Sequence, residues 1–392
     1  MMDAADIETL AAVPLAFYAA LAALAAWGAL MVLRGDFWRA DQRLVEGELQ
    51  PERWPAVAAI VPARNEADVV VQALSSIAEQ DYEGEVRIFL VDDRSEDETA
   101  ALARGIAGVT VVTGRDAPDG WTGKMWAISQ GIAAMETAQI MAEYVWLTDA
   151  DIAHHPGELA SLVAGSEHGG LDLNSLMVRL RIERLWDVLL IPAFVFFFQK
   201  LYPFPWVNDP ARKTAAAAGG SMLVHRPALA RTGGISSIAG ELIDDCALAQ
   251  RIKSSGGRIR LSLATETHSI RAYGSVGEIW CMVARTAFHQ LNYSVPALAV
   301  TIAAMVFLYL LPPVLTIVGL MMGEMPAAAA AVAAWFAMGW AFAPTLYRYG
   351  VSPYYGFTLP LAGFLYTLMT LDSARRHWQG RGGEWKGRTH RP

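Results

Sequence analysis

The sequence predicts an α/β domain with a mostly parallel sheet, connected to apolar membrane segments near both ends of the chain. Between residues 56 and 148, short apolar runs alternate with helix-like stretches, which is typical of parallel strands covered by helices. Hydrophobic residues make up 54% of the chain and charged residues only 18%, whereas a soluble domain carries about 25% charged residues. Four uncharged stretches are long enough to cross the roughly 30 Å hydrocarbon core of a bilayer: residues 11–33, 294–323, 325–346 and 349–371.

Composition also limits the number of domains and the classes of function that the chain can have. A chain of 392 residues suits one large domain or two ordinary ones. The net charge of −8 argues against a nucleic-acid binder, which usually carries a basic face. The two cysteines, Cys246 and Cys281, form no disulfide or metal-binding pattern, and so few thiols fit a reducing compartment.

The first four strands of the α/β domain are expected at residues 56–61, 86–91, 109–113 and 144–148. Ser95 begins a Ser-Glu-Asp-Glu run and is expected to cap the helix that follows the second strand. In open sheets of this type, ligands bind beyond the carboxyl ends of the strands. The chain contains neither G-x-G-x-x-G nor G-x-x-x-x-G-K-[ST], so the two common phosphate-binding loops are absent.

The first apolar stretch is expected to be an uncleaved anchor, because acidic rather than basic residues precede it. Arg34, Arg39 and Arg43 follow the anchor, so the positive-inside rule places the region after it in the cytosol. The C-terminal tail is also basic and should also be cytosolic. Three C-terminal spans would instead leave the tail outside, because an odd number of crossings separates it from the cytosolic region. One of those stretches is therefore expected to be re-entrant or interfacial, with a break at Pro312-Pro313, Pro353 or Pro360.

A shorter apolar helix is expected near residues 186–206, flanked by aromatic residues. Such flanks favour an interfacial helix at the membrane surface, and a buried core helix is the alternative. The chain then divides into an anchor and linker, an α/β domain, a membrane region and a basic tail, at residues 1–50, 51–290, 291–372 and 373–392.

Three acidic sites carry the predicted chemistry. Asp149 and Asp151 form a D-x-D at a strand end, where carboxylates at i and i+2 point the same way and can share Mg²⁺ or Mn²⁺. A D-x-D also arises by chance about once in a chain of this size. Asp92 and Asp93 end another strand and could accept hydrogen bonds from a base or ribose, or Asp93 could simply cap a helix.

The third site is the adjacent pair Asp244 and Asp245. Neighbouring carboxylates repel, so one pKa should be raised, which suits a general base; the alternative is a helix cap. Lys124, after a glycine, could neutralise a phosphate or lie in a solvated turn. Gly219 and Gly220 allow either a close approach to an acceptor or a simple turn.

Taken in order, these residues resemble the family 2 glycosyltransferases, which have a GT-A fold, over residues 55–285. The resemblance implies a nucleotide-sugar donor, expected to be a UDP-sugar, a divalent metal at the D-x-D, and inversion at the anomeric carbon. Arg94 stands where that family usually has glycine. The roles implied are catalysis by Asp245 with Asp244, metal binding by Asp149 and Asp151, and nucleotide-sugar binding by Pro62, Ala63, Arg64, Glu66, Asp92, Asp93, Lys124, Asp149, Gly220 and Arg285.

The arrangement of apolar segments is also similar to the hopanoid-associated glycosyltransferases of the HpnB type, which resemble ceramide glucosyltransferases. That resemblance implies transfer to a hopanoid or other lipid at the bacterial inner membrane. Processive synthases of the family carry Gln-x-x-Arg-Trp; here only Arg285 of that motif remains, so a single sugar is expected to be transferred. The rivals are a polyprenyl-phosphate glycosyltransferase, with Lys200, Arg212 and Lys213 as acceptor contacts, and an inactive membrane scaffold.

Overall fold

The structure is a computed structural model that describes residues 4–44 and 50–381. The chain forms two compact units. One contains Asp41–Arg181 and Phe204–Tyr273, and the other contains Ile182–Pro203, Gly274–Gln379 and the N-terminal residues through Ala40. The boundaries drawn from the sequence stay a prediction.

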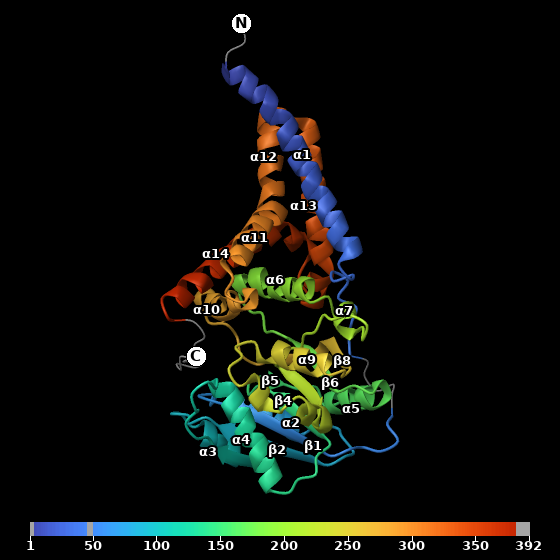
Figure 1. Cartoon of the computed structure of the whole chain (residues 1–392), viewed down its shortest axis with the longest axis vertical. Coiled ribbons are helices and arrows are strands. Elements are labelled where there is room, and N and C mark those ends of the chain that lie inside the picture. Colours follow the sequence, from blue (N-terminus) through green and yellow to red (C-terminus); the bar gives the residue numbers. More distant parts are fainter. Residues whose placement is uncertain (1–3, 45–49, 382–392) are drawn as a thin grey trace. The chain divides into compact units, whose positions relative to one another are not determined.

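The first unit is built on an eight-stranded sheet in the order β3-β2-β1-β4-β7-β6-β8-β5. Its first half is parallel, and α4 covers β1 and β2 (Figure 1). The elements of this half are β1 (Val57–Ala63), α2 (Val70–Ala78), β2 (Val86–Asp92), α3 (Thr99–Arg104), β3 (Val109–Thr113), α4 (Gly123–Thr137) and β4 (Tyr144–Thr148). The predicted alternation of strands and helices is confirmed.

The second half of the sheet is mixed. β7 is antiparallel to both β4 and β6, whereas β6 and β8 are parallel, so β4, β6 and β8 all run in the same direction. Its elements are β5 (Ile152–Ala153), α5 (Glu158–Gly169), β6 (Leu173–Arg179), α7 (Phe204–Asn208), β7 (Ser221–His225), α8 (Arg226–Arg231), η1 (Ile235–Ile238), α9 (Asp244–Ser254) and β8 (Ile259–Ser269).

Apolar periodicity explains why the central strands and their helices form. Every residue of β1 and β4 is buried, as expected for strands covered on both faces. On α2, Val70, Ala73, Leu74 and Ile77 are buried, and this i, i+3, i+4, i+7 spacing places them on one face against the sheet. The resulting core fixes the carboxyl ends of β1, β2 and β4 at one edge, where the predicted acidic sites lie.

The predicted cap at Ser95 is wrong. The helix begins four positions later, with Thr99 as the first residue of α3 and no side-chain cap at Glu98. The Ser95 hydroxyl instead accepts a hydrogen bond from the Asn65 amide (3.0 Å), and Asp97 accepts from the Thr99 amide (3.0 Å). The Ser95 side chain therefore joins two loops instead of capping the helix, as the local sequence pattern predicts.

The second unit is helical. Within it α1, α12 and α13 pack side by side (Figure 1). Its elements are α1 (Ala4–Leu33), α6 (Leu185–Leu201), α10 (Val276–Thr286), η2 (His289–Leu291), α11 (Val295–Met305), η3 (Val306–Leu310), α12 (Leu311–Met322), α13 (Met325–Arg348), η4 (Pro353–Thr358) and α14 (Leu359–Trp378).

Three helical segments of the described residues are long and apolar enough to cross a membrane: Leu15–Leu33, Val295–Met322 and Met325–Arg348. The second is continuous across Pro312-Pro313 because a π-helical turn, η3, precedes the two prolines. The fourth apolar stretch of the sequence is instead divided between the short η4 and α14.

The helix expected near residues 186–206 is present as α6, and it packs against α13 and α14 within its unit. Its middle is buried, including Leu190, Ile191 and Phe196, whereas Leu185 and Trp186 at its start are exposed. The core interpretation therefore describes the middle of α6, and an interfacial position of its start stays a prediction.

Candidate active site

The carboxyl ends of β1 and β2 are joined by two interlocking loops. Asn65 and Arg94 both adopt left-handed backbone conformations (φ 53° and 54°), and the carbonyl oxygens of Asp93 and Arg94 accept hydrogen bonds from the Arg64 guanidinium (2.7 and 3.0 Å). Glycine adopts this conformation without the steric cost paid by other residues. This explains why a glycine would be favourable at the position of Arg94, whose side chain pairs with Asp116.

The two acids that end β2 are enclosed by these loops. Asp92 is 7% exposed and accepts a hydrogen bond from the Ser95 amide (3.3 Å), while Asp93 is 1% exposed and donates its amide to the Ala63 carbonyl (2.8 Å). Pro62 and Ala63 form the buried end of β1 beside them. Neither Asp92 nor Asp93 caps α3, so the helix-cap alternative does not apply.

An arginine that the sequence interpretation missed connects two of the predicted sites. Arg271 pairs with Glu66 after β1 and lies 3.5 Å from the Asp151 carboxylate of the D-x-D. The Ile270 amide donates to the Asp151 carbonyl (2.8 Å), which continues the pairing of β5 with β8 and places Arg271 there. The sequence offers only one hint of this role: Arg271 lies two residues after the end of the strand β8.

Lys124 lies in the first turn of α4, among the carboxylates of the other two sites. Its Nζ is 2.9 Å from Asp149 Oδ1 and 3.4 Å from Asp244 Oδ2. Burial alone would lower the pKa of Lys124, but Asp149, Asp244 and Asp245 hold it above its usual value. The ammonium group is therefore charged, and it links the D-x-D to the Asp244-Asp245 pair.

Asp245 has the strongest local constraints. Its Oδ2 accepts from the Gly219 amide (2.9 Å) and its Oδ1 from the Cys246 amide (2.7 Å). Burial and the neighbouring Asp244 raise the pKa of Asp245 to about 6, against the opposing effect of Lys124. A carboxyl group with a pKa in this range can be ionised at neutral pH and still accept a proton.

The glycine pair after residue 218 provides the space for this contact. A Cβ on Gly219 would lie 3.2 Å from Lys124 Nζ and 3.5 Å from Asp245 Oδ2, so a side chain there would crowd both charged groups. A Cβ on Gly220 would lie 2.9 Å from the Val178 side chain. Gly219 therefore borders the charged cluster, whereas Gly220 packs on β6.

A buried polar network, which the sequence interpretation missed, holds Thr148 directly before the D-x-D. His154 Nε2 is 2.8 Å from the Thr148 hydroxyl, His154 Nδ1 is 3.0 Å from Glu158, and Glu158 also accepts from Ser221 (2.6 Å) and Thr267. The pattern His-x-x-x-Glu at helical spacing hints at one pair within it.

The hydrogen bonds of this network hold Thr148 from two sides. The Thr148 hydroxyl donates to the Gly220 carbonyl (2.8 Å) and lies beside His154 Nε2, and His154 Nδ1 in turn contacts the Glu158 carboxylate. Burial would raise the pKa of Glu158, but His154 and the two hydroxyl donors hold it below its usual value. This buried network fixes Thr148, the residue before Asp149.

The carboxylates of the D-x-D fit a hard divalent cation. Asp149 and Asp151 are partly exposed, with side-chain exposures of 36% and 24%. Among the described residues no three His, Cys, Asp or Glu side chains form a complete metal cage. Mg²⁺ sites of one or two carboxylates completed by substrate phosphates need no such cage. The donor set thus suits a metal that binds together with a diphosphate.

Arg285 lies at the end of α10, in the helical unit, and is exposed. Its contact with a diphosphate stays a prediction.

The family comparison agrees with this geometry. Residues 58–229 match the model described as Glycosyl transferase family 2. This segment is a family 2 glycosyltransferase domain. The match begins in β1 and ends in α8, so it includes the loops after β1 and β2, Lys124 and the D-x-D of the glycosyltransferase domain.

Two curated relatives match parts of the chain. An N-acetylglucosaminyltransferase from Rhizobium leguminosarum bv. viciae is 46% identical over 54 residues, which is 14% of this chain and 13% of that protein. The 4,4'-diaponeurosporenoate glycosyltransferase of Staphylococcus aureus (strain MRSA252) is 39% identical over 98 residues, which is 25% of this chain and 24% of that protein. The matched segment thus spans a quarter or less of each relative's length.

A solved structure covers nearly the whole chain. The mannosyltransferase PcManGT from Pyrobaculum calidifontis, in complex with GDP-Man and Mn²⁺, has a TM-score of 0.52 and is 20% identical. The match covers 93% of this chain and 99% of that one. The likeness confirms the GT-A-like α/β fold with apolar helices on both sides of it in the sequence.

Proposed function

We propose that this glycosyltransferase moves a single sugar from a nucleotide-sugar, with a UDP-sugar as the expected donor, to a lipid hydroxyl with inversion of configuration. The observation that carries the proposal is Asp245: a half-buried carboxylate with a pKa raised to about 6, fixed by two backbone amides and linked through Lys124 to the D-x-D. A base of this kind beside a diphosphate-binding motif suits direct displacement.

In the proposed reaction Asp245 accepts the proton of the acceptor hydroxyl as its oxygen attacks the anomeric carbon. The bond from that carbon to the nucleoside diphosphate breaks on the opposite face, so configuration inverts. The Gly219 and Cys246 amides fix the orientation of the Asp245 carboxylate. Asp244 lies 3.4 Å from Lys124 and raises the basicity of its neighbour by charge repulsion.

The donor would be held by the loops after β1 and β2, with Pro62, Ala63, Arg64, Glu66, Asp92 and Asp93 around the nucleoside. Asp149 and Asp151 would hold Mg²⁺ or Mn²⁺, which stabilises negative charge on a departing diphosphate. Lys124 would contribute a second positive charge to the same phosphates once they bind. Arg271 would then exchange its contact with Asp151 for one with the donor.

A lipid acceptor is supported by the three candidate spans. After the first crossing, Val295–Met322 and Met325–Arg348 form a pair that returns the chain to the same side. The glycosyltransferase domain and the basic residues Arg375 and Arg376 of α14 would then share the cytosolic side of a bacterial inner membrane. This arrangement would remove the conflict in the sequence prediction, because the fourth stretch, divided between η4 and α14, is not among the candidate spans of the described residues. A hopanoid is the acceptor that the HpnB-type resemblance suggests.

The experiment is turnover by the purified full-length protein in detergent with bacterial lipid extract. Nucleotide-sugars are supplied one at a time with Mn²⁺ or Mg²⁺, and then with EDTA. Metal- and lipid-dependent release of a nucleoside diphosphate, with a new glycolipid, would support the proposal. A well-folded protein that binds no nucleotide-sugar would instead favour the inactive scaffold.

The Asp245→Asn variant separates the acceptor classes in the same assay. A lipid hydroxyl needs a base, so its glycosylation should fall by about 10²- to 10⁴-fold. A polyprenyl phosphate is already anionic and should retain most activity. Two of the three cations suggested as contacts of a polyprenyl phosphate already have partners within the protein. Arg212 is 3.8 Å from Asp209, and Lys200 donates to Tyr309 (2.6 Å).

A further inference from the structure

The glycosyltransferase unit contains a cavity away from the acidic cluster. It has a volume of about 410 Å³ and is bordered by the linker at residues 41–44, by α5, by the chain after α7 and by the start of β8. The D-x-D follows the carboxyl end of β4, and β8 runs in the same direction as β4. Arg258 and Arg260 lie at the beginning of β8. The cavity is therefore near the amino ends of these strands, whereas the D-x-D is at the carboxyl end of β4.

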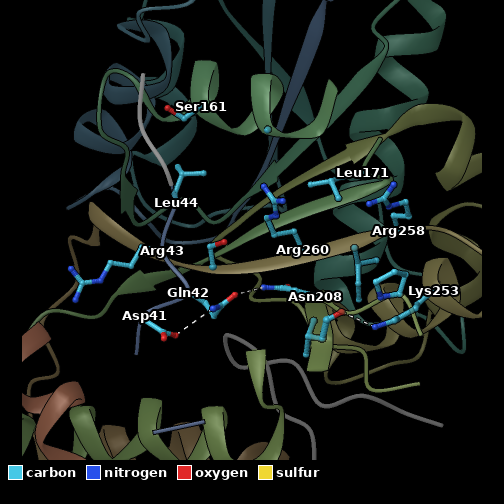
Figure 2. A pocket seen from close by; sticks show the side chains of 15 residues that line it. Asp41, Gln42, Arg43, Leu44, Ser161, Leu171, Asn208, Lys253, Arg258 and Arg260 are labelled. Atoms are coloured by element: carbon cyan, nitrogen blue, oxygen red, sulfur yellow. Dashed lines mark hydrogen bonds between the residues drawn. The ribbon is translucent and has the colours of Figure 1, made fainter. Parts of the chain in front are cut away.

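The cavity is strongly basic although the chain is acidic. Four cations border it, namely Arg43, Lys253, Arg258 and Arg260, against one acid, Asp41. In Figure 2, Arg260 projects between Leu44 and Leu171, with Arg43 and Arg258 on its two sides. Such a concentration of one charge in a concave surface raises the local concentration of counter-ions.

Two of these cations are available to a ligand. Lys253 is not, because its ammonium group donates to the carbonyls of Val207 (2.6 Å), Thr214 (2.8 Å) and Asp209 (3.0 Å). Within residues 4–44 and 50–381, by contrast, no hydrogen bond or ion pair holds the guanidinium groups of Arg258 and Arg260.

The walls around these arginines are connected by hydrogen bonds. The linker pairs with β8, since the Leu263 amide donates to the Gln42 carbonyl (2.7 Å) and the Leu44 amide to the Leu263 carbonyl (3.3 Å). Asn208 donates to Gln42 (3.2 Å) and accepts from the Leu261 amide (2.7 Å). On α5, Gly165 lies beside Arg260, whose Nη1 would be in van der Waals contact, at 3.7 Å, with a Cβ at that position.

We propose that this cavity is a binding site for a phosphate-bearing anion, separate from the donor site, with Arg258 and Arg260 as its main ligands. Guanidinium groups bind phosphate oxygens through paired N–H donors, which suits two unpaired arginines in one pocket. The phosphate could belong to a phospholipid headgroup or to a soluble phosphate compound. The inference does not depend on the proposed transfer reaction, because it concerns different residues.

The test compares two double variants with equal loss of charge. Arg258→Gln/Arg260→Gln removes the proposed ligands, and Arg104→Gln/Arg251→Gln removes two exposed arginines outside the cavity lining. Thermal unfolding of both variants confirms folding. Binding of inorganic pyrophosphate is measured by calorimetry on the full-length protein in EDTA, and retention of phosphatidylglycerol by native mass spectrometry.

Loss of the two ligands should weaken binding by about tenfold or more, because a hydrogen bond to a charged group contributes about 1.5–3 kcal/mol. A loss confined to pyrophosphate identifies a soluble ligand, and a loss confined to phosphatidylglycerol identifies a lipid headgroup; either supports the site. Unchanged binding of both probes, or an equal loss in the control variant, would overturn it. Asp149→Asn should leave this binding component intact, which separates it from the donor site.

Discussion

Replacing Asp245 by Asn should remove a pH-dependent instability as well as activity. In the folded protein the pKa of Asp245 is raised from 3.8 to about 6 by burial and by Asp244. For an acid whose folded pKa is raised, the stabilising contribution is present below the unfolded value and is lost as pH rises through the folded value. At about pH 8 the ionised Asp245 thus lowers the free energy of unfolding by on the order of 3 kcal/mol, since each pKa unit corresponds to about 1.4 kcal/mol.

At about pH 4.5 the carboxyl group of Asp245 is mostly protonated in the folded state, and the cost falls to about 1 kcal/mol. Between about pH 4.5 and pH 8, the free energy of unfolding of the unmutated protein should therefore fall by about 2 kcal/mol more than that of the Asn variant. For a domain of this size that is a difference of about 4–8 °C in the shift of the unfolding temperature. Titrating groups that do not interact with Asp245 are common to both proteins and cancel.

The assay is thermal unfolding of both proteins in detergent and EDTA at the two pH values. Asn cannot accept from both the Gly219 and Cys246 amides, so the variant also has a pH-independent cost, which the comparison across pH removes. Parallel unfolding temperatures of the two proteins across this pH range would refute the reasoning. So would a variant that is destabilised more at high pH than at low pH.

Three further predictions concern the residues around the base. Lys124→Met removes the cation that lowers the pKa of Asp245, so the acidic limb of the pH–rate profile should move to higher pH; an unmoved limb would contradict the coupling. Asp149→Asn should abolish the metal dependence of nucleotide-sugar binding, measured by calorimetry with and without EDTA, whereas Asp116→Asn on the surface should not. Glu158→Gln replaces the buried carboxylate that accepts from Ser221 and Thr267 and contacts His154, and should cost about 1–3 kcal/mol in unfolding measurements at neutral pH; unchanged stability of the variant would contradict a supporting role for this network.

The sequence by itself determined the elements whose cause is local or periodic. Apolar runs between polar turns predicted β1, β2, β3 and β4, because buried parallel strands need continuous apolar residues. Uncharged stretches of about 20 residues predicted the spans, because a bilayer core sets that length. The acidic residues could be placed at strand ends for the same reason: in a parallel sheet those ends share one edge.

Only the tertiary structure decided which side chains meet. Ser95 contacts Asn65 rather than capping α3, and Arg271 reaches Glu66 and Asp151 from a strand far along the chain. The adjacency of Asp244 and Asp245 predicted one raised pKa, but burial, its largest cause, and the contacts of Lys124 depend on groups brought together from α4, the D-x-D and α9. Such contacts are set by the packing of the sheet, and spacing along the sequence carries no information about them. For the same reason the basic cavity beside β8, which combines four separate segments, could not be predicted from sequence.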